Sequence, residues 1–116
     1  MSDNGDELVN LTSSLKKCFQ IAYNHVQAAP GATEVYKTLI RNEEMQLVVL
    51  SKDLPDKPRE MIMAKCQSNN VPVVFIETRS ELGKLCPTKV KNAGAFGIKN
   101  FMLETEEKAF LMSQLK

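Results

Sequence analysis

The chain has few of the residues that most often carry catalysis. Of its 116 residues, His25 is the one histidine. No serine or cysteine stands in a nucleophile motif, and no G-x-G-x-x-G or Walker loop follows an apolar run. His25 comes at the end of a helical pattern, where a polar residue suits the helix dipole. These absences predict a protein that is not an enzyme and that uses no cofactor or small-molecule substrate.

Cysteine is scarce and scattered. Cys18, Cys66 and Cys86 lie far apart, with no CxxC spacing. An odd, scattered set of cysteines argues against a disulfide framework and against a structural zinc site. It favours an intracellular protein whose reduced thiols pack as small apolar groups. Asp53 and Asp56 flank a loop and could ligate a hard cation, but acidic loops bordered by proline are more often plain turns. No metal site is therefore predicted.

Long apolar runs are also missing. The longest are LVVL and VPVVFI, far short of the roughly 20 residues that a membrane span needs. The first residues, MSDNGDELVN, are acidic and polar and do not resemble a secretory signal. We therefore expect one domain over residues 1–116, with residues 1–7 flexible and with no membrane contact.

Charge is balanced overall but unevenly placed. The net charge is +1, yet the segment 79–99 carries five basic residues against the single acid Glu81. A molecule with one basic side can meet a phosphate backbone. Taken alone, this segment is more typical of a solvated charged loop.

The apolar spacing predicts helices alternating with strands. Such an order predicts an α/β fold, a three-layer α/β/α sandwich with a mixed central sheet of about four strands. Pro72 suggests that the second strand begins at a sheet edge or outside the ladder, although its apolar run is typical of a buried strand. Ser80 lies just before the short fourth helix, and Thr105 or Glu104 starts the last one. The expected helices are 8–26, 32–41, 55–68, 81–85 and one from about 105, and the expected strands are 47–50, 71–76 and 93–98, with a further short strand possible at 26–29.

Two stretches at a fixed separation carry a family resemblance. GATEVYKTL, residues 31–39, precedes the LVVL strand, and SELGKL, residues 80–85, follows the VPVVFI strand. Together they resemble the kink-turn RNA-binding superfamily of archaeal and eukaryotic ribosomal and ribonucleoprotein proteins. The resemblance extends from about Leu15 to Ile98 and implies a non-catalytic RNA-binding protein.

The end of the chain narrows the resemblance. Lys99-Asn100-Phe101, the acidic run 104–107 and a closing apolar helix look like the C-terminus of the eukaryotic small-subunit ribosomal protein S-twelve-e family. That likeness implies a structural constituent of the small ribosomal subunit, bound to ribosomal RNA and neighbouring ribosomal proteins in the cytoplasm and assembled in the nucleolus. The loop between Leu85 and Ala93 is shorter than is usual there. Alternatives in the superfamily are the box C/D and spliceosomal kink-turn protein, its H/ACA counterpart and the protein subunit of eukaryotic ribonuclease P. The alternative from another class of function is a protein-binding adaptor of the same fold, without RNA contact.

The resemblance places the first RNA-binding element at the front of helix 31–41. A helix N-terminus attracts phosphate, and a glycine there lets backbone approach closely. The resemblance implies that Glu34 accepts hydrogen bonds from a guanine edge and that Lys37 reaches a base or phosphate. Without it, the simpler interpretation is an intrahelical ion pair between these two residues. The residues expected to bind RNA here are Gly31, Ala32, Thr33, Glu34 and Lys37.

Thr33 departs from the pattern of the kink-turn binders, which carry asparagine at this position. A hydroxyl cannot make the two-ended contact that an amide makes with guanine. The resemblance places the second element in loop 86–91, beside the front of the Gly31 helix. There Val90 is expected to pack on a flipped base while Lys89 and Lys91 meet phosphate. Cys86 is expected to be part of the core.

Overall fold

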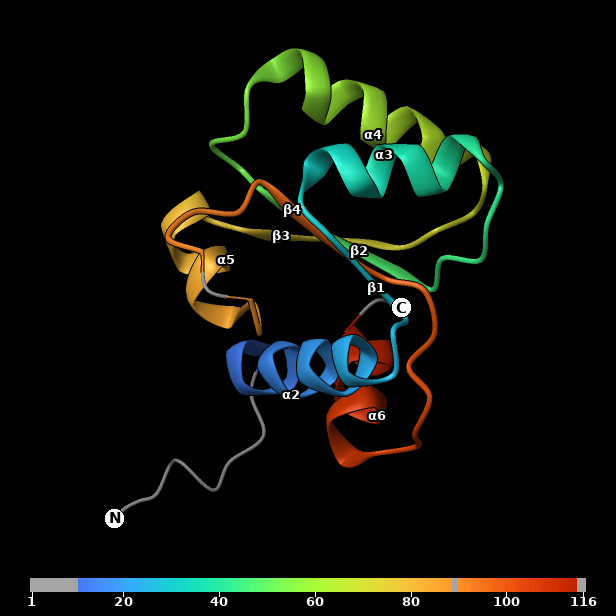
Figure 1. Cartoon of the computed structure of the whole chain (residues 1–116), viewed down its shortest axis with the longest axis vertical. Coiled ribbons are helices and arrows are strands. Elements are labelled where there is room, and N and C mark those ends of the chain that lie inside the picture. Colours follow the sequence, from blue (N-terminus) through green and yellow to red (C-terminus); the bar gives the residue numbers. More distant parts are fainter. Residues whose placement is uncertain (1–10, 89, 115–116) are drawn as a thin grey trace.

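The computed structural model describes residues 11–88 and 90–114, and these contain a four-stranded sheet with helices on both faces (Figure 1). The expectation that residues 1–7 are flexible lies outside the described residues. The elements are α2 (Leu11–Asn24), β1 (Ala28–Pro30), α3 (Ala32–Ile40), β2 (Leu47–Ser51), α4 (Asp56–Ser68), β3 (Val73–Ile76), α5 (Arg79–Leu85), β4 (Ala95–Ile98) and α6 (Glu106–Gln114).

The strands follow the spatial order β1-β4-β2-β3. β4 runs antiparallel to both β1 and β2, whereas β2 and β3 are parallel. The possible strand at 26–29 is present as β1, displaced by about two residues. The predicted mixed sheet of four strands is therefore confirmed.

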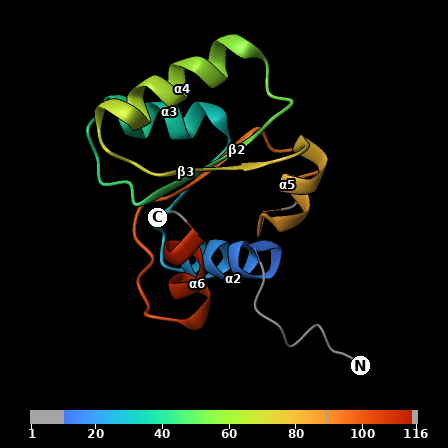
Figure 2. The same cartoon turned by 180° about the vertical axis from the view of Figure 1, so that it is seen from behind.

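Helices cover both faces of the sheet. α3 and α4 lie on one face, while α2, α5 and α6 lie on the other, as the front and back views show (Figures 1 and 2). Each face has its own apolar cluster, one around Leu39 and Ile62 and the other around Phe19 and Leu111. The predicted three-layer arrangement is confirmed.

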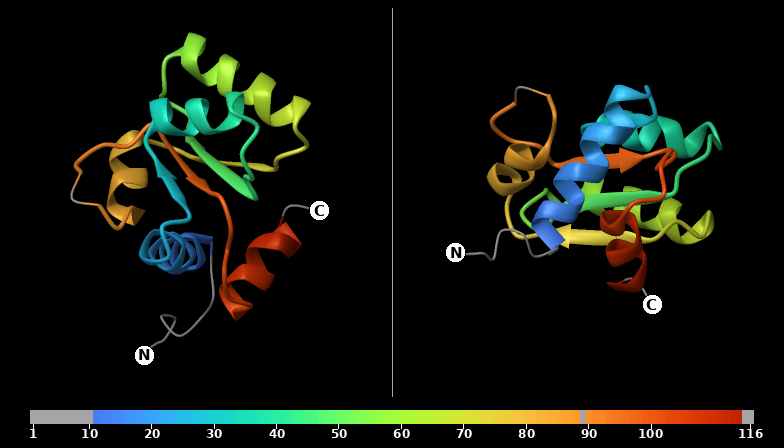
Figure 3. Two further views of the ribbon diagram at one scale, coloured as in Figure 1. Left: turned by 45° about the vertical axis from the view of Figure 1, so that its right-hand side comes forward. Right: turned by 90° about the horizontal axis from the view of Figure 1, so that it is seen from below.

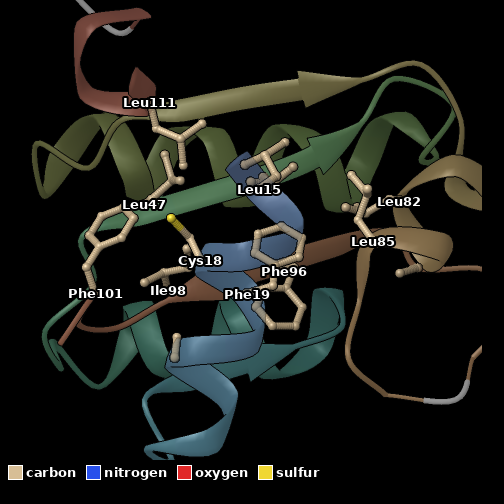
Figure 4. Close-up of a cluster of buried hydrophobic side chains, with 13 residues drawn as sticks. Leu15, Cys18, Phe19, Leu47, Leu82, Leu85, Phe96, Ile98, Phe101 and Leu111 are labelled. Atoms are coloured by element: carbon tan, nitrogen blue, oxygen red, sulfur yellow. The ribbon is translucent and has the colours of Figure 1, made fainter. Parts of the chain in front are cut away.

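The cluster under α2 explains why that helix forms where it does. Leu15, Phe19 and Ala22, spaced by three and four residues, are fully buried and present one helical face to the sheet. The ring of Phe19 stacks on that of Phe96, with centroids 4.0 Å apart (Figure 4). α2 ends after Asn24 because Val26 takes a left-handed φ of 59° and Gln27 N donates to Ala22 O at 2.7 Å, a closure typical of helix C-termini.

The structure corrects two local predictions. β3 was expected to be buried, but it is a sheet edge and all four of its residues are half-buried. The short helix begins at Arg79, earlier than predicted, and its cap is Thr78, whose hydroxyl accepts from Glu81 N at 3.1 Å. By contrast, Thr105 accepts from Lys108 N at the start of α6, as predicted.

The thiols have the environment that the sequence suggests. Cys18 and Cys66 are buried, Cys86 is half-buried, and all three are free. Burial raises the pKa of each thiol to about 11, so each stays protonated at neutral pH. Across residues 11–88 and 90–114, no three acidic, cysteine or histidine side chains cluster as a metal site would require. None of the helices in these ranges has the length and apolar character to cross a membrane.

Candidate nucleic-acid interface

The front of α3 is held by the sheet. Gly31 N donates to Ala95 O at 2.9 Å, and Gly31 O accepts from Val35 N at 3.0 Å. The first bond fixes the helix start to β4, and the second begins the helix. Because Gly31 is the N-cap, no side chain caps this end of the helix. The N–H groups of the first turn are therefore available to a ligand.

Gly31 is required by conformation rather than by packing. Its φ is +92°, in the region that side chains disfavour, yet a Cβ placed on it would meet nothing within 4 Å. The space in front of the helix is thus open. A nucleic-acid backbone can approach this end without displacing any described part of the protein.

Loop 86–92 lies beside the helix front. A hollow of about 350 Å³ separates the two, and both Gly31 and Val90 line it. Val90 is 46% exposed, an apolar side chain at the mouth of a small cavity. The adjacency implied by the family resemblance is therefore present in this chain. The full lining is Pro30, Gly31, Cys86, Thr88, Val90, Asn92, Ala93 and Gly94.

The loop is positioned by its contact with α5. A Cβ on Gly83 would lie 2.5 Å from Lys91 O and 3.1 Å from Asn92 N, so only glycine lets the loop close this tightly. Ala93 N then donates to Arg79 O at 2.9 Å. The side chain of Lys91 stays exposed, free to meet an anionic partner.

Gly83→Ala tests this contact. An alanine within a helix ordinarily stabilises it by up to about 1 kcal/mol, but here the methyl group would meet a backbone carbonyl. We expect the free energy of unfolding in urea to fall by about 1–3 kcal/mol. Lys84→Ala, an exposed site on the same helix, is the matched control and should change it little. A Gly83→Ala protein more stable than the unaltered one would contradict the described loop position.

Glu34 has a different partner from the one considered in the sequence. Its carboxylate lies 3.7 Å from Arg41 Nη2, with both side chains about half exposed. Arg41 is held more closely by Glu43, at 2.8 Å, and that hydrogen bond lowers the pKa of Glu43. Within the described residues no ion pair joins Glu34 to Lys37. The Glu34 carboxylate can therefore leave this long, solvent-exposed ion pair with Arg41 at little cost and accept hydrogen bonds from a ligand.

Lys37 does not lie with the loop. Together with Thr33 it lines a second, mostly apolar groove of about 370 Å³ between α3 and α4. Both side chains are exposed. The structure therefore brings Gly31 and Val90 together at one hollow, while Thr33 and Lys37 open onto a neighbouring groove. The second groove is lined by Ala32, Thr33, Tyr36, Lys37, Ile40, Pro58, Met61 and Ile62.

Sequence reasoning missed some of this site. Lys89 lies outside the described residues, so its predicted role stays a prediction. Cys86, expected in the core, packs against the core and also lines the hollow. The α3–α4 groove was not foreseen, although Thr33, Lys37 and Ile40 recur at steps of four and three on one helical stripe. That spacing is the signal that points to it.

The chain is similar in sequence to a family of known proteins. The model of the "Ribosomal protein L7Ae/L30e/S12e/Gadd45 family" matches residues 13–105. The chain is 34% identical over 80 residues to the "Small nuclear ribonucleoprotein associated homolog 13" of Caenorhabditis elegans, a match covering 66% of this chain and 60% of that protein. It is 35% identical over 79 residues to the "NHP2-like protein 1 homolog" of Drosophila melanogaster, covering 66% and 60%.

A solved structure shows the same fold. A protein of unknown function from Bacillus halodurans superposes with a TM-score of 0.68 over 92% of this chain and 97% of that one, at 20% identity. The curated relatives extend beyond the matched region, since the match covers about 60% of their length.

Proposed function

Because the chain belongs to the "Ribosomal protein L7Ae/L30e/S12e/Gadd45 family", we propose that it is a non-catalytic RNA-binding subunit of a ribonucleoprotein particle. The observation that carries the proposal is the uncapped front of α3 at Gly31, open to solvent and bordered by the hollow and the basic loop. Phosphate meets the first-turn N–H groups, and an unstacked base enters beside Val90.

The first candidate is a kink-turn-binding subunit of a small nucleolar or spliceosomal particle. The relative named "Small nuclear ribonucleoprotein associated homolog 13" supports it, as does the likeness of GATEVYKTL to the kink-turn pattern. In this role Glu34 accepts from a guanine edge and Lys37 reaches a base or phosphate along the α3–α4 groove.

The second candidate is a constituent of the small ribosomal subunit. Thr33 favours it, because threonine replaces the asparagine of kink-turn binders and weakens readout of an isolated kink-turn. The residues after β4 favour it too: Lys99-Asn100-Phe101, the acidic run 104–107 and the helix α6 follow one another, which is the order on which the small-subunit resemblance rests. This protein would act in the cytoplasm beside neighbouring ribosomal proteins.

One titration tests the proposal and separates its candidates. The protein and the variant Thr33→Asn are titrated with a kink-turn RNA and with a straight duplex of equal length at one salt concentration. We expect the unaltered protein to prefer the kink-turn. Thr33→Asn should tighten kink-turn binding by about 1–2 kcal/mol, since the amide offers a paired donor and acceptor.

Thr12→Asn is the matched control, because Thr12 is an exposed threonine on α2, and it should leave the affinity unchanged. Tight kink-turn binding with no gain from Thr33→Asn favours the small nuclear particle. Weak kink-turn binding by the unaltered protein, with tighter binding by Thr33→Asn, favours the small ribosomal subunit. Equal affinity for the kink-turn and the duplex would reject kink-turn recognition. Binding to neither RNA would also reject it, and would favour a protein-binding adaptor of the same fold.

A further inference from the structure

The two edges of the sheet are shielded differently. β1, at one edge, has three residues and ends in Pro30, which has no N–H to offer another strand. β3, at the other edge, has four residues that are all half-buried, whereas β2 and β4 between them are buried throughout. The view from below shows β3 as the outermost strand of the sheet, with α6 crossing in front of it (Figure 3).

The backbone of β3 presents free hydrogen-bonding groups. Val48 N donates to Pro72 O, and Lys52 N donates to Ile76 O, so these carbonyls face β2. Successive residues of a strand direct their backbone groups to opposite sides. Val73 and Phe75 therefore direct their N–H and C=O groups outward. Within residues 11–88 and 90–114 no backbone hydrogen bond reaches them.

The side chains of β3 do nothing to block pairing. Proteins usually protect an open edge with lysine, proline or an inward charge. The strand reads VVFI, without charge, proline or glycine. A groove of about 460 Å³ flanks the edge on the α4 face and one of about 490 Å³ flanks it on the other face. The first is lined by Glu60, Met63, Ala64, Gln67, Val71 and Val73.

We propose that β3 pairs antiparallel with β3 of a second copy of this chain, joining the two sheets into one. A two-fold axis at Val74 sets Val73 against Phe75 of the other copy, and these are the residues whose backbone groups face outward. The pairing supplies about four backbone hydrogen bonds. A two-fold interface must be self-complementary, and an uncharged strand of this kind meets that condition.

Residues of α4 flank the edge on one face. Met63 and Ala64 line the groove there together with Val73, and two-fold pairing about Val74 brings the same surface of the other copy alongside. Met63 is 39% exposed in the single chain, an apolar side chain that this contact covers.

Self-association of the full chain without RNA is the test. Sedimentation velocity from about 1 to 500 μM should show a reversible monomer–dimer equilibrium with a micromolar dissociation constant. Met63→Glu places a carboxylate in the groove beside Val73, on the surface that the second copy covers, and should weaken the dimer by at least about tenfold. Met61→Glu is the matched control: Met61 is 40% exposed on the same helix but lines the α3–α4 groove, so the dimer should persist.

Amide hydrogen exchange locates the contact. The N–H groups of Val73 and Phe75 should exchange quickly in dilute protein and become protected as the concentration rises. A monomer at every concentration overturns the proposal. So does a dimer that leaves these amides unprotected, or one that Met61→Glu weakens as much as Met63→Glu. RNA affinity is not part of this readout, so failure of the proposed RNA role leaves the result intact.

Discussion

Reversing the charge of Lys89 and Lys91 together, as Lys89→Glu and Lys91→Glu, is expected to weaken RNA binding at least about tenfold at moderate salt. The slope of log affinity against log salt should fall by about two, one for each phosphate that the loop no longer neutralises. Lys91 is exposed on a loop whose neighbour Val90 lines the same hollow as Gly31. A phosphate that meets the helix front therefore passes close to this loop.

The control must carry the same charge change elsewhere. Lys16 and Lys17 are exposed on α2, which lies across the sheet from α3 (Figure 1). Lys16→Glu with Lys17→Glu should leave RNA affinity and its salt slope much closer to those of the unaltered protein. Equal losses from both pairs would show that general charge, rather than the loop, attracts RNA. An unchanged affinity in the Lys89 and Lys91 double variant would remove the loop from the interface.

Truncating Phe96 is expected to cost about 3–5 kcal/mol of unfolding free energy. Phe96 is fully buried on β4, between Pro30 of β1 and Val49 of β2, and its ring stacks on Phe19. In Phe96→Ala the cavity lies beneath α2, where Figure 4 shows the aromatic pair at the centre of the cluster. A loss of this size approaches the whole stability of many small proteins.

Urea unfolding followed by circular dichroism measures the effect. Phe96→Leu keeps most of the volume and should cost about 1.5 kcal/mol or less. Tyr23→Ala removes an aromatic ring that is 44% exposed on α2 and should cost less than about 1 kcal/mol. If Phe96→Ala were no worse than Tyr23→Ala, the stacked pair would not hold α2 to the sheet.

Local patterns predicted most elements because burial determines where their apolar residues fall in the sequence. Leu15, Phe19 and Ala22 mark α2 by their spacing, and the uninterrupted LVVL run marks β2 as a strand covered on both sides. β3 shows the limit of this reasoning. VVFI has the same composition as a central strand, and its place at the edge depends on strand order. Pro72, just before the strand, was a local signal of an edge, but the apolar run outweighed it in the prediction.

The candidate site was likewise predicted only in part from the sequence. The family resemblance predicted that Gly31 and loop 86–91 lie side by side, and in the structure both line one hollow. The partner of Glu34 could not be foreseen, because Arg41 sits at the helix C-cap and reaches back toward Glu34 while bound to Glu43. Lys37 was expected to reach a base or phosphate from the front of helix 31–41, and in the structure its side chain lines the α3–α4 groove.

The pairing of β1 with β4 also governs the order of events during synthesis. Gly31 is tied to Ala95, and Ala28 to Ile98, across most of the chain. While a ribosome is still producing this protein, α3 can form as a helix, but its front has no partner until residues 95–98 have left the exit tunnel. Contacts so distant in sequence form late. A nascent chain therefore acquires its oriented helix front only after residues 95–98 have emerged and β4 has paired with β1.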